Sequence, residues 1–378
     1  MDRLSEPHAH VRFAAWPRWA TRAMLAMMAS ALVLAALVTD PQTGKATGEV
    51  AEETATVPSP AIEESEFEAA EPPRDTDLAL YDAVIERVAA GEGYYEVVVE
   101  AQRARDFPVR PGLAVRLPTL ATVSAWLGPA GLLAAAALLV LATLWAWWRK
   151  LGADPLMADK RLVAIVLLAI GIFSGFKPTY FALHEAWAGV LLALSFGLHR
   201  RDGEQTRCFG AWIAAAAALA IRELALPFVL LMGALALYRR EWREGAAWAV
   251  LAALFALGLW LHLSQVAALT SPADPASPSW LALRGLAGWT ESVSLTTILY
   301  RLPGWLAGPL AVLPLLGWAA WNARAGLFGL CLFTGYALLL AIAGRENNFY
   351  WALMVVPAYF VGLVLVPRAL STLFERAR

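Results

Sequence analysis

The sequence predicts an all-α fold: a polytopic transmembrane helix bundle of about ten spans. Hydrophobic residues make up 59% of the 378 residues and charged residues only 16%, whereas soluble domains contain about 45–50% and about 25%. The apolar residues are gathered in long blocks, as expected for helices that cross a bilayer. Trp, which concentrates at membrane interfaces, occurs 17 times. These observations indicate an integral membrane protein rather than a soluble domain.

The N-terminal part is expected to hold a basic tail, one span and a linker. Residues 1–22 are basic, and the apolar run at 23–39 follows them. Such a pair is also typical of a signal peptide. Because Asp40-Pro41 bounds the run and no persuasive cleavage site follows, we interpret it as an uncleaved first span. Residues 40–74 are rich in Glu, Ala, Thr and Pro, which predicts a disordered acidic linker.

Residues 75–118 are the only sizeable segment that we expect to fold outside the membrane, as a first outer loop. Apolar residues at helical spacing predict a short helix at 77–90 and a second at 94–106, with glycines between them. A helix with one apolar stripe is typical of an element that lies at the interface, on top of a bundle.

The remaining part, 119–378, is predicted to carry about nine further spans. Two short blocks, 208–221 and 225–238, would each cover about 21 Å of a roughly 30 Å core. Because Arg residues flank the pair at both outer ends, we expect a hairpin with its tip at Arg222-Glu223. The expected spans are 119–148, 161–176, 180–198, 208–221, 225–238, 245–263, 304–321, 325–343 and 349–366.

Charged loops predict the orientation of these spans. With both termini and the loops 149–161, 199–207, 239–244 and 322–324 in the cytosol, that side holds 18 Lys and Arg against 9 Asp and Glu. The other side holds 12 against 22. Cytoplasmic loops carry an excess of basic residues. The excess of Arg over Lys is associated with GC-rich bacteria. We therefore expect a multi-pass protein of the bacterial inner (plasma) membrane with cytosolic N- and C-termini.

Polar groups interrupt the apolar segments at three places, all at predicted outer ends of spans. Charges near membrane depth are costly and mark a functional site by default. We therefore expect the three groups to meet the outer loop at one site. The groups are Lys177, His184 and Glu185; Arg222 and Glu223; and Arg345, Glu346, Asn347 and Asn348.

Each group also has a purely structural interpretation, and these stay open. Arg222 with Glu223 would serve as an ion pair that holds the hairpin. His184 with Glu185 would serve as a cap and interface anchor for the following span, and the Arg345 segment as an ordinary polar loop. An Asp ahead of the first outer-loop helix would cap that helix, a role compatible with catalysis.

A loose motif runs through the outer loop: Asp77-x-x-x-Tyr81, Gly91, Tyr94-Tyr95, an aromatic–Pro pair and Arg116-Leu-Pro118. This motif resembles the first outer loop of GT-C superfamily glycosyltransferases, most closely bacterial mannosyltransferase-like members. The acidic linker ahead of it is longer than in many members. Asp75 and Asp77 both match the family's acidic residue, and the spacing to Tyr81 favours Asp77.

The resemblance implies an enzyme, a hexosyltransferase that takes a sugar from a polyprenyl phosphate on the outer (periplasmic) face. In that family the acidic residue of the loop is the general base, here Asp77 or alternatively Asp75. The acceptor would be a glycan, a lipid or a protein. A single base and direct displacement would invert the anomeric centre.

Residue chemistry agrees with such a mechanism. A leaving phosphate needs positive charge in a site of low dielectric, and the planar fork of Arg binds phosphate oxygens. The candidates for holding phosphate are Arg222, Lys177, His184 and Arg345, supported by Glu185, Glu223, Asn347 and Tyr81. A divalent metal (Mg²⁺ or Mn²⁺) on Asp75, Asp77 and Glu185 stays open, although no tight metal-ligand spacing is present.

Two other functions stay open. A transporter or lipid flippase would also place polar groups within apolar helices, but the sequence shows no internal repeat. A non-catalytic membrane scaffold or subunit would use the acidic linker as a partner-binding tail. The sequence contains neither a Gly-rich phosphate loop nor a basic patch interleaved with aromatic residues, which argues against nucleotide and nucleic-acid partners.

Overall fold

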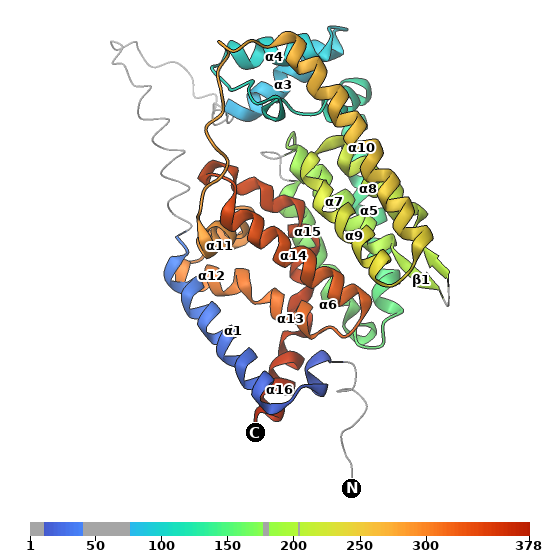
Figure 1. The fold of residues 1–378 in the computed structure, drawn as a ribbon, viewed down its shortest axis with the longest axis vertical. Coiled ribbons are helices and arrows are strands. Elements are labelled where there is room, and N and C mark those ends of the chain that lie inside the picture. The colour runs from blue at the N-terminus through green and yellow to red at the C-terminus, as the bar shows by residue number, and fades with distance from the viewer. Residues whose placement is uncertain (1–10, 41–75, 177–180, 203–204) are drawn as a thin grey trace, which may run out of the picture.

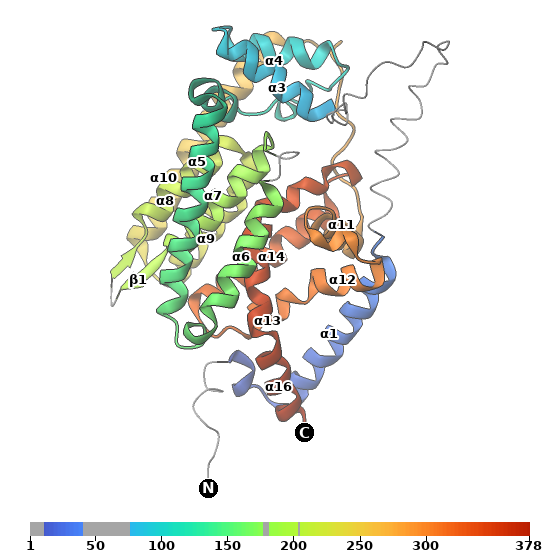
Figure 2. The same ribbon diagram turned by 180° about the vertical axis from the view of Figure 1, so that it is seen from behind.

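The computed structural model describes residues 11–40, 76–176, 181–202 and 205–378. Within these ranges the fold is helical apart from one small antiparallel hairpin, β1 (Arg200–Asp202) with β2 (Gln205–Arg207). The helices form an elongated bundle. Two short helices lie across one end, and the start of α1 lies with α16 at the other (Figures 1 and 2). Almost all of the predicted acidic linker lies outside the described residues.

The helices follow the predicted blocks closely over most of the chain. Up to α10 they are η2 (Arg12–Ala15), α1 (Arg18–Val38), α3 (Thr76–Ala89), α4 (Tyr94–Arg103), η3 (Gly112–Ala114), α5 (Thr119–Gly152), η4 (Ala158–Lys160), α6 (Arg161–Gly175), α7 (His184–Leu198), α8 (Phe209–Ile221), η6 (Glu223–Ala225), α9 (Leu226–Tyr238) and α10 (Trp242–Leu269). The remaining ones are α11 (Gly285–Leu295), η7 (Ile298–Arg301), α12 (Gly304–Val312), α13 (Pro314–Ala320), α14 (Arg324–Ile342), η8 (Glu346–Met354), α15 (Val356–Tyr359), η9 (Phe360–Leu365) and α16 (Val366–Ala377).

Five helical segments of the described chain are long and apolar enough to cross a membrane. They are Arg18–Val38, Gly112–Gly152, Trp242–Leu269, Arg324–Ile342 and Val356–Ala377. Four shorter apolar segments accompany them, at His184–Leu198, Phe209–Ile221, Glu223–Tyr238 and Gly304–Ala320. The predicted helical membrane fold is confirmed at this level, while the count of ten spans stays a prediction.

Large apolar side chains cover the outside of the bundle. Leu133, Leu138 and Leu141 on α5 are exposed, as are Leu257 and Trp260 on α10. Soluble monomers rarely expose apolar patches of more than a few hundred Å². A bilayer accepts such a surface without cost, so these faces of α5 and α10 suit contact with lipid.

The two short helices predicted at 77–90 and 94–106 are present as α3 and α4. Together with the chain up to residue 118 they form a small unit that we call the cap. Gly91, with φ +95°, makes the turn between the helices in a conformation that other residues rarely adopt. The cap has its own apolar cluster, separate from the main core, which includes Leu80, Val84 and Val97 and reaches Val266 on α10. The cap is therefore seated on the end of α10.

A bidentate ion pair also fastens the cap to the loop after α10. Arg103 donates from Nε to Asp274 Oδ1 at 2.6 Å and from Nη2 to Oδ2 at 2.8 Å. The hydrogen bonds from Arg103 are the main reason why the pKa of Asp274 lies below its usual value of 3.8. The hydrogen bond from the backbone N–H of Ser271 is the second cause. A carboxyl with a lowered folded-state pKa stabilises the fold above its unfolded pKa, and this stabilisation is lost as the pH falls through the folded value.

We expect Asp274→Asn to loosen the cap at neutral pH. Hydrogen exchange across residues 94–110 should be faster than in the wild type at pH 7, and the difference should shrink progressively as the pH falls from about 3.8 toward the lower folded-state pKa. Glu92→Gln is the matched control, since Glu92 pairs with Arg87 inside the cap. A difference between wild type and Asp274→Asn that does not shrink as the pH falls below about 3.8 would contradict this account.

The last predicted span, 349–366, is not a single α-helix. It consists of η8, α15 and η9, three short helices in sequence. Pro357 is one cause, because it lacks a backbone N–H and interrupts the hydrogen bonding of a regular helix. Tight packing also surrounds the segment: a Cβ added at Gly189 would lie 2.0 Å from Leu353 O, and one at Gly317 would overlap Gly362 O. The segment is almost entirely buried inside the bundle.

Candidate functional site

A cavity of about 450 Å³ lies between the cap and the nearby end of the bundle. Segments that are far apart in the sequence supply its polar lining. The polar lining residues are Tyr81, Gln102, Asp106 and Arg116 from the cap, Arg222 and Glu223 between α8 and α9, Ser277 from the loop after α10, and Arg345, Asn347, Asn348 and Tyr350 around the start of η8. The structure thus brings the hairpin tip and the Arg345 segment together under the cap.

The expected break at the hairpin tip is present. Arg222 ends α8 with an extended backbone (φ −148°, ψ 121°), and η6 begins at the next residue. Helices α8 and α9 have 13 residues each, and α10 contacts both. This break removes the regular helical geometry at Arg222 and places its side chain at the cavity.

Glu185 is the centre of a buried charge cluster beside the cavity. Its Oε1 accepts a hydrogen bond from Arg222 Nε at 2.6 Å and lies 3.9 Å from Arg116 Nη2. Glu185 and Arg222 are each 1% exposed, and Arg222 also pairs with Glu223. Buried charges persist when they are paired. The structural ion-pair interpretation of Arg222 therefore has direct geometric support, and its partners include Glu185 as well as Glu223.

Arg116 is a site residue that the sequence reasoning missed. Its Nε donates to the Tyr81 hydroxyl at 3.2 Å, and its Nη2 donates to the Tyr350 hydroxyl at 3.4 Å. Desolvation raises the pKa of Tyr81 to about 12, and the charge of Arg116 opposes that rise. Tyr81 therefore stays a protonated hydroxyl near neutral pH. Arg116 was visible as part of the outer-loop motif, but nothing in its spacing showed that it would face Glu185.

Arg345 is the least neutralised cation in the cavity lining. Within the described residues it forms no ion pair with a carboxylate, and its buried Nε has no hydrogen-bond partner. Its Nη2 lies 3.5 Å from Ser277 Oγ, while its backbone N–H donates to Asn348 Oδ1 at 3.1 Å. The Asn348 contact fixes the start of η8. The side chain of Arg345 thus retains unused donors at a partly buried place, as an anion site requires.

His184 lies behind this lining rather than on it. The residue is 4% exposed, and its ring packs edge-on against Tyr81 with centroids 5.3 Å apart. Neither ring nitrogen has a hydrogen-bond partner among the described residues. It borders a small adjoining cavity together with Tyr81 and Arg116. The structure does not bring His184 onto the main cavity, so its predicted contact with phosphate would need a rearrangement.

The candidate general bases fall at the edge of what the structure describes. Asp75 and Lys177 lie outside the described residues, and of Asp77 only the backbone is described, in the first turn of α3. Residues four apart lie on the same face of a helix. Position 77 therefore shares the face of α3 that carries Tyr81, whose side chain lines the cavity. Asp106, also in the lining, is a described carboxylate that the sequence did not single out.

The described part of the chain contains no group of three or more His, Cys, Asp or Glu able to hold a metal ion. The predicted set of Asp75, Asp77 and Glu185 depends on side chains outside that part. Comparison of the chain with protein-family models, with curated proteins and with solved structures finds no match. The functional argument therefore depends on the geometry of the cavity and on the chemistry of its lining.

Proposed function

We propose that this protein is a membrane glycosyltransferase that moves a sugar from a polyprenyl phosphate to a glycan, lipid or protein acceptor. One observation carries the proposal. Arg116 and Arg345, more than 200 positions apart, both line a cavity beside the α3 face on which position 77 lies. Positive charge next to an acidic residue, at the end of an apolar bundle, suits the transfer of a sugar from a lipid phosphate.

The proposed reaction is a single displacement at the anomeric carbon. The acceptor oxygen forms a bond to that carbon, and the bond from the carbon to the phosphate oxygen breaks. Asp77 takes the acceptor proton, and polyprenyl phosphate leaves with the bonding electrons. Arg345 and Arg116 stabilise the charge that develops on the phosphate, since Arg forms bidentate, charge-assisted hydrogen bonds with phosphate oxygens. The displacement inverts the anomeric centre.

A lipid-linked donor also fits the apolar part of the lining. Leu113, Leu224, Trp280 and Trp351 border the same cavity as the Arg side chains. Ligand cavities commonly combine a mainly apolar wall with a few placed polar groups. In the proposed orientation the cap lies on the periplasmic side of a bacterial inner membrane, both termini are cytosolic, and about ten spans cross the bilayer.

Sugar transfer by the purified protein in proteoliposomes tests this function. We expect radiolabelled sugar to move from polyprenyl phosphate to an acceptor, and we expect Arg345→Ala to raise the donor KM by about 10-fold or more, because it removes a hydrogen bond to a charged group. Arg301→Ala is the control, since Arg301 contacts the ring and hydroxyl of Tyr300 and does not line the cavity. Lipid movement across the vesicle without sugar transfer would instead support the flippase interpretation, and an unchanged donor KM would remove Arg345 from the phosphate site.

A further inference from the structure

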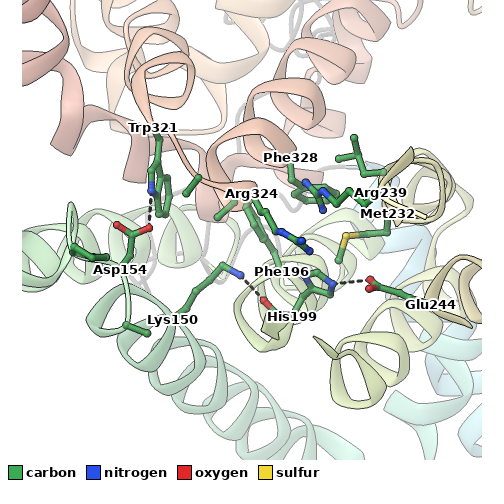
Figure 3. Close-up of a pocket in the computed structure, with 15 residues that line it drawn as sticks. Lys150, Asp154, Phe196, His199, Met232, Arg239, Glu244, Trp321, Arg324 and Phe328 are labelled. Carbon is green, nitrogen blue, oxygen red and sulfur yellow. Dashed lines mark hydrogen bonds and ion pairs between the residues drawn. The ribbon is translucent and has the colours of Figure 1, made fainter. Parts of the chain in front are cut away.

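A second cavity, of about 230 Å³, lies at the opposite end of the bundle (Figure 3). The end of α5, the residue after α7, the residue after α9, the start of α10 and the start of α14 all contribute to it. Three of its lining side chains are cations, from Lys150, Arg239 and Arg324. The glycosyltransferase proposal assigns no role to this cavity.

Three of the four carboxylate oxygens in this second cavity have hydrogen-bond partners, and the fourth, Glu244 Oε2, is buried without a partner among the described residues. Asp154 accepts hydrogen bonds from the backbone N–H of Leu156 and from Trp321 Nε1, both at 2.9 Å. Glu244 Oε1 lies 2.7 Å from His199 Nε2 and accepts from Trp248 Nε1 at 3.1 Å. These contacts hold the acidic groups against the wall of the cavity.

Two of the cations, Arg239 and Arg324, keep side-chain donors that no carboxylate within the described residues occupies. Arg324 donates from Nη1 to Glu241 at 2.6 Å, which leaves its other donors unused by that pair. Arg239 is half-buried and makes no ion pair with a carboxylate within the described chain. Burial lowers the pKa of Arg239 and repulsion from Arg324 lowers it further, while attraction from Glu241 and Glu244 opposes the shift without cancelling it. Figure 3 shows both side chains directed into the cavity. Two like charges in a partly desolvated place are costly, and an anion between them would remove that cost.

The surroundings indicate which anion would reach the site. Exposed Trp145 near the end of α5 and exposed Trp242 at the start of α10 flank this end of the bundle. Arg149 stacks over Trp145 with 5.2 Å to the ring centroid, and Arg161 over Trp148 with 4.0 Å. Trp and Arg at the ends of apolar helices are typical of the level of lipid head groups. Arg also binds phosphate better than Lys does where a planar, bidentate contact is possible.

We propose that this second cavity binds a phosphate group between Arg239 and Arg324, supplied by the head group of an anionic phospholipid. Lys150, which donates to the His199 carbonyl oxygen and lies over the Phe196 ring, adds positive charge at the floor of the cavity. The occupant would link the ends of α9 and α14 and neutralise their charges. This inference does not depend on the glycosyltransferase proposal, because it concerns other residues at the other end of the bundle.

Native mass spectrometry of the full-length protein, titrated with dioleoyl phosphatidylglycerol or with dioleoyl phosphatidylcholine, tests the site. We expect the wild type to prefer phosphatidylglycerol, and Arg239→Gln with Arg324→Gln to weaken that binding by about 10-fold or more, since two charge-assisted contacts are lost. Arg240→Gln is the matched control, because Arg240 is exposed, adjacent in sequence and outside the cavity lining. It should keep the wild-type affinity.

Several outcomes would overturn the proposal. These are equal binding of the two lipids by the wild type, wild-type affinity in the double variant, or an equal loss in Arg240→Gln, which would indicate general surface charge. Binding of inorganic phosphate without any lipid preference would assign the cavity to a soluble phosphate and refute the lipid source. If the double variant fails to fold, a competition experiment between phosphatidylglycerol and inorganic anions on the wild-type protein tests the site instead. Inorganic phosphate should displace phosphatidylglycerol more effectively than chloride does at equal ionic strength, and equal displacement would refute the site.

Discussion

Asp77→Asn is expected to lower kcat for sugar transfer by about 10²–10⁴-fold, the range that general acid–base catalysis contributes. An amide has the shape of the carboxylate but does not accept the acceptor proton. The donor KM should change little, because in the proposed site Arg345 and Arg116, rather than the base, hold the phosphate. Steady-state transfer rates at saturating donor measure this loss, and the temperature of unfolding in detergent shows whether the variant is folded.

Two controls separate Asp77 from the other acidic residues near the cavity. Asp75→Asn tests the second match to the outer-loop motif, and Asp106→Asn tests the described carboxylate of the lining. Both variants should keep rates within a few-fold of the wild type. Loss of activity in Asp106→Asn with full activity in Asp77→Asn would move the base from α3 to the turn after α4. Full activity in an Asp75→Asn, Asp77→Asn double variant would refute both carboxylates of the motif as the base.

Glu185→Ala is expected to destabilise the fold by about 3–5 kcal/mol, the range measured when one partner of a buried ion pair is removed. Arg222, which is 1% exposed in the wild type, would lose its 2.6 Å contact and keep only its pair with Glu223, and Arg116 would lose its nearest carboxylate. Thermal and denaturant unfolding in a fixed detergent measure the change. Glu223→Ala is the control, because its side chain is 21% exposed and water can replace part of the lost contact with Arg222.

A compensating pair strengthens this test. Replacing a buried ion pair by apolar residues of similar volume is often neutral or stabilising, so Glu185→Leu with Arg222→Met should recover much of the stability lost in Glu185→Ala. A cost below about 1 kcal/mol for Glu185→Ala would show that the cluster is solvated and that the buried ion-pair account is wrong.

Much of the fold was predictable from the sequence because long apolar blocks and their charged ends are local signals. The bounds of α1, α5, α8 and α9 lie within a few residues of the predicted spans. Segment 349–366 was not predictable in the same way. Its backbone is shaped by contacts with Gly189 and with the rest of the core, and such contacts join residues distant in sequence.

The candidate site was predictable only in part for the same reason. Costly charges in apolar segments indicated Arg222 and Arg345, and both line the cavity under the cap. Which cation is neutralised depends on tertiary contacts: Glu185 pairs with Arg222, while Arg345 keeps unused donors. The sequence made both Arg candidates for holding phosphate, whereas in the structure Arg222 is paired with Glu185 and Glu223, and Arg345 forms no ion pair with a carboxylate within the described residues.

The position of the donor phosphate is the most direct test of the account. A structure of the protein with a bound polyprenyl-phosphate sugar, determined by electron cryo-microscopy, would show it. The account predicts the phosphate in the cavity beneath the cap, in contact with Arg345 and Arg116, with the sugar facing Asp77. A phosphate held elsewhere, for example between Arg239 and Arg324 at the opposite end of the bundle, or an Asp77 carboxylate turned away from the sugar, would contradict it.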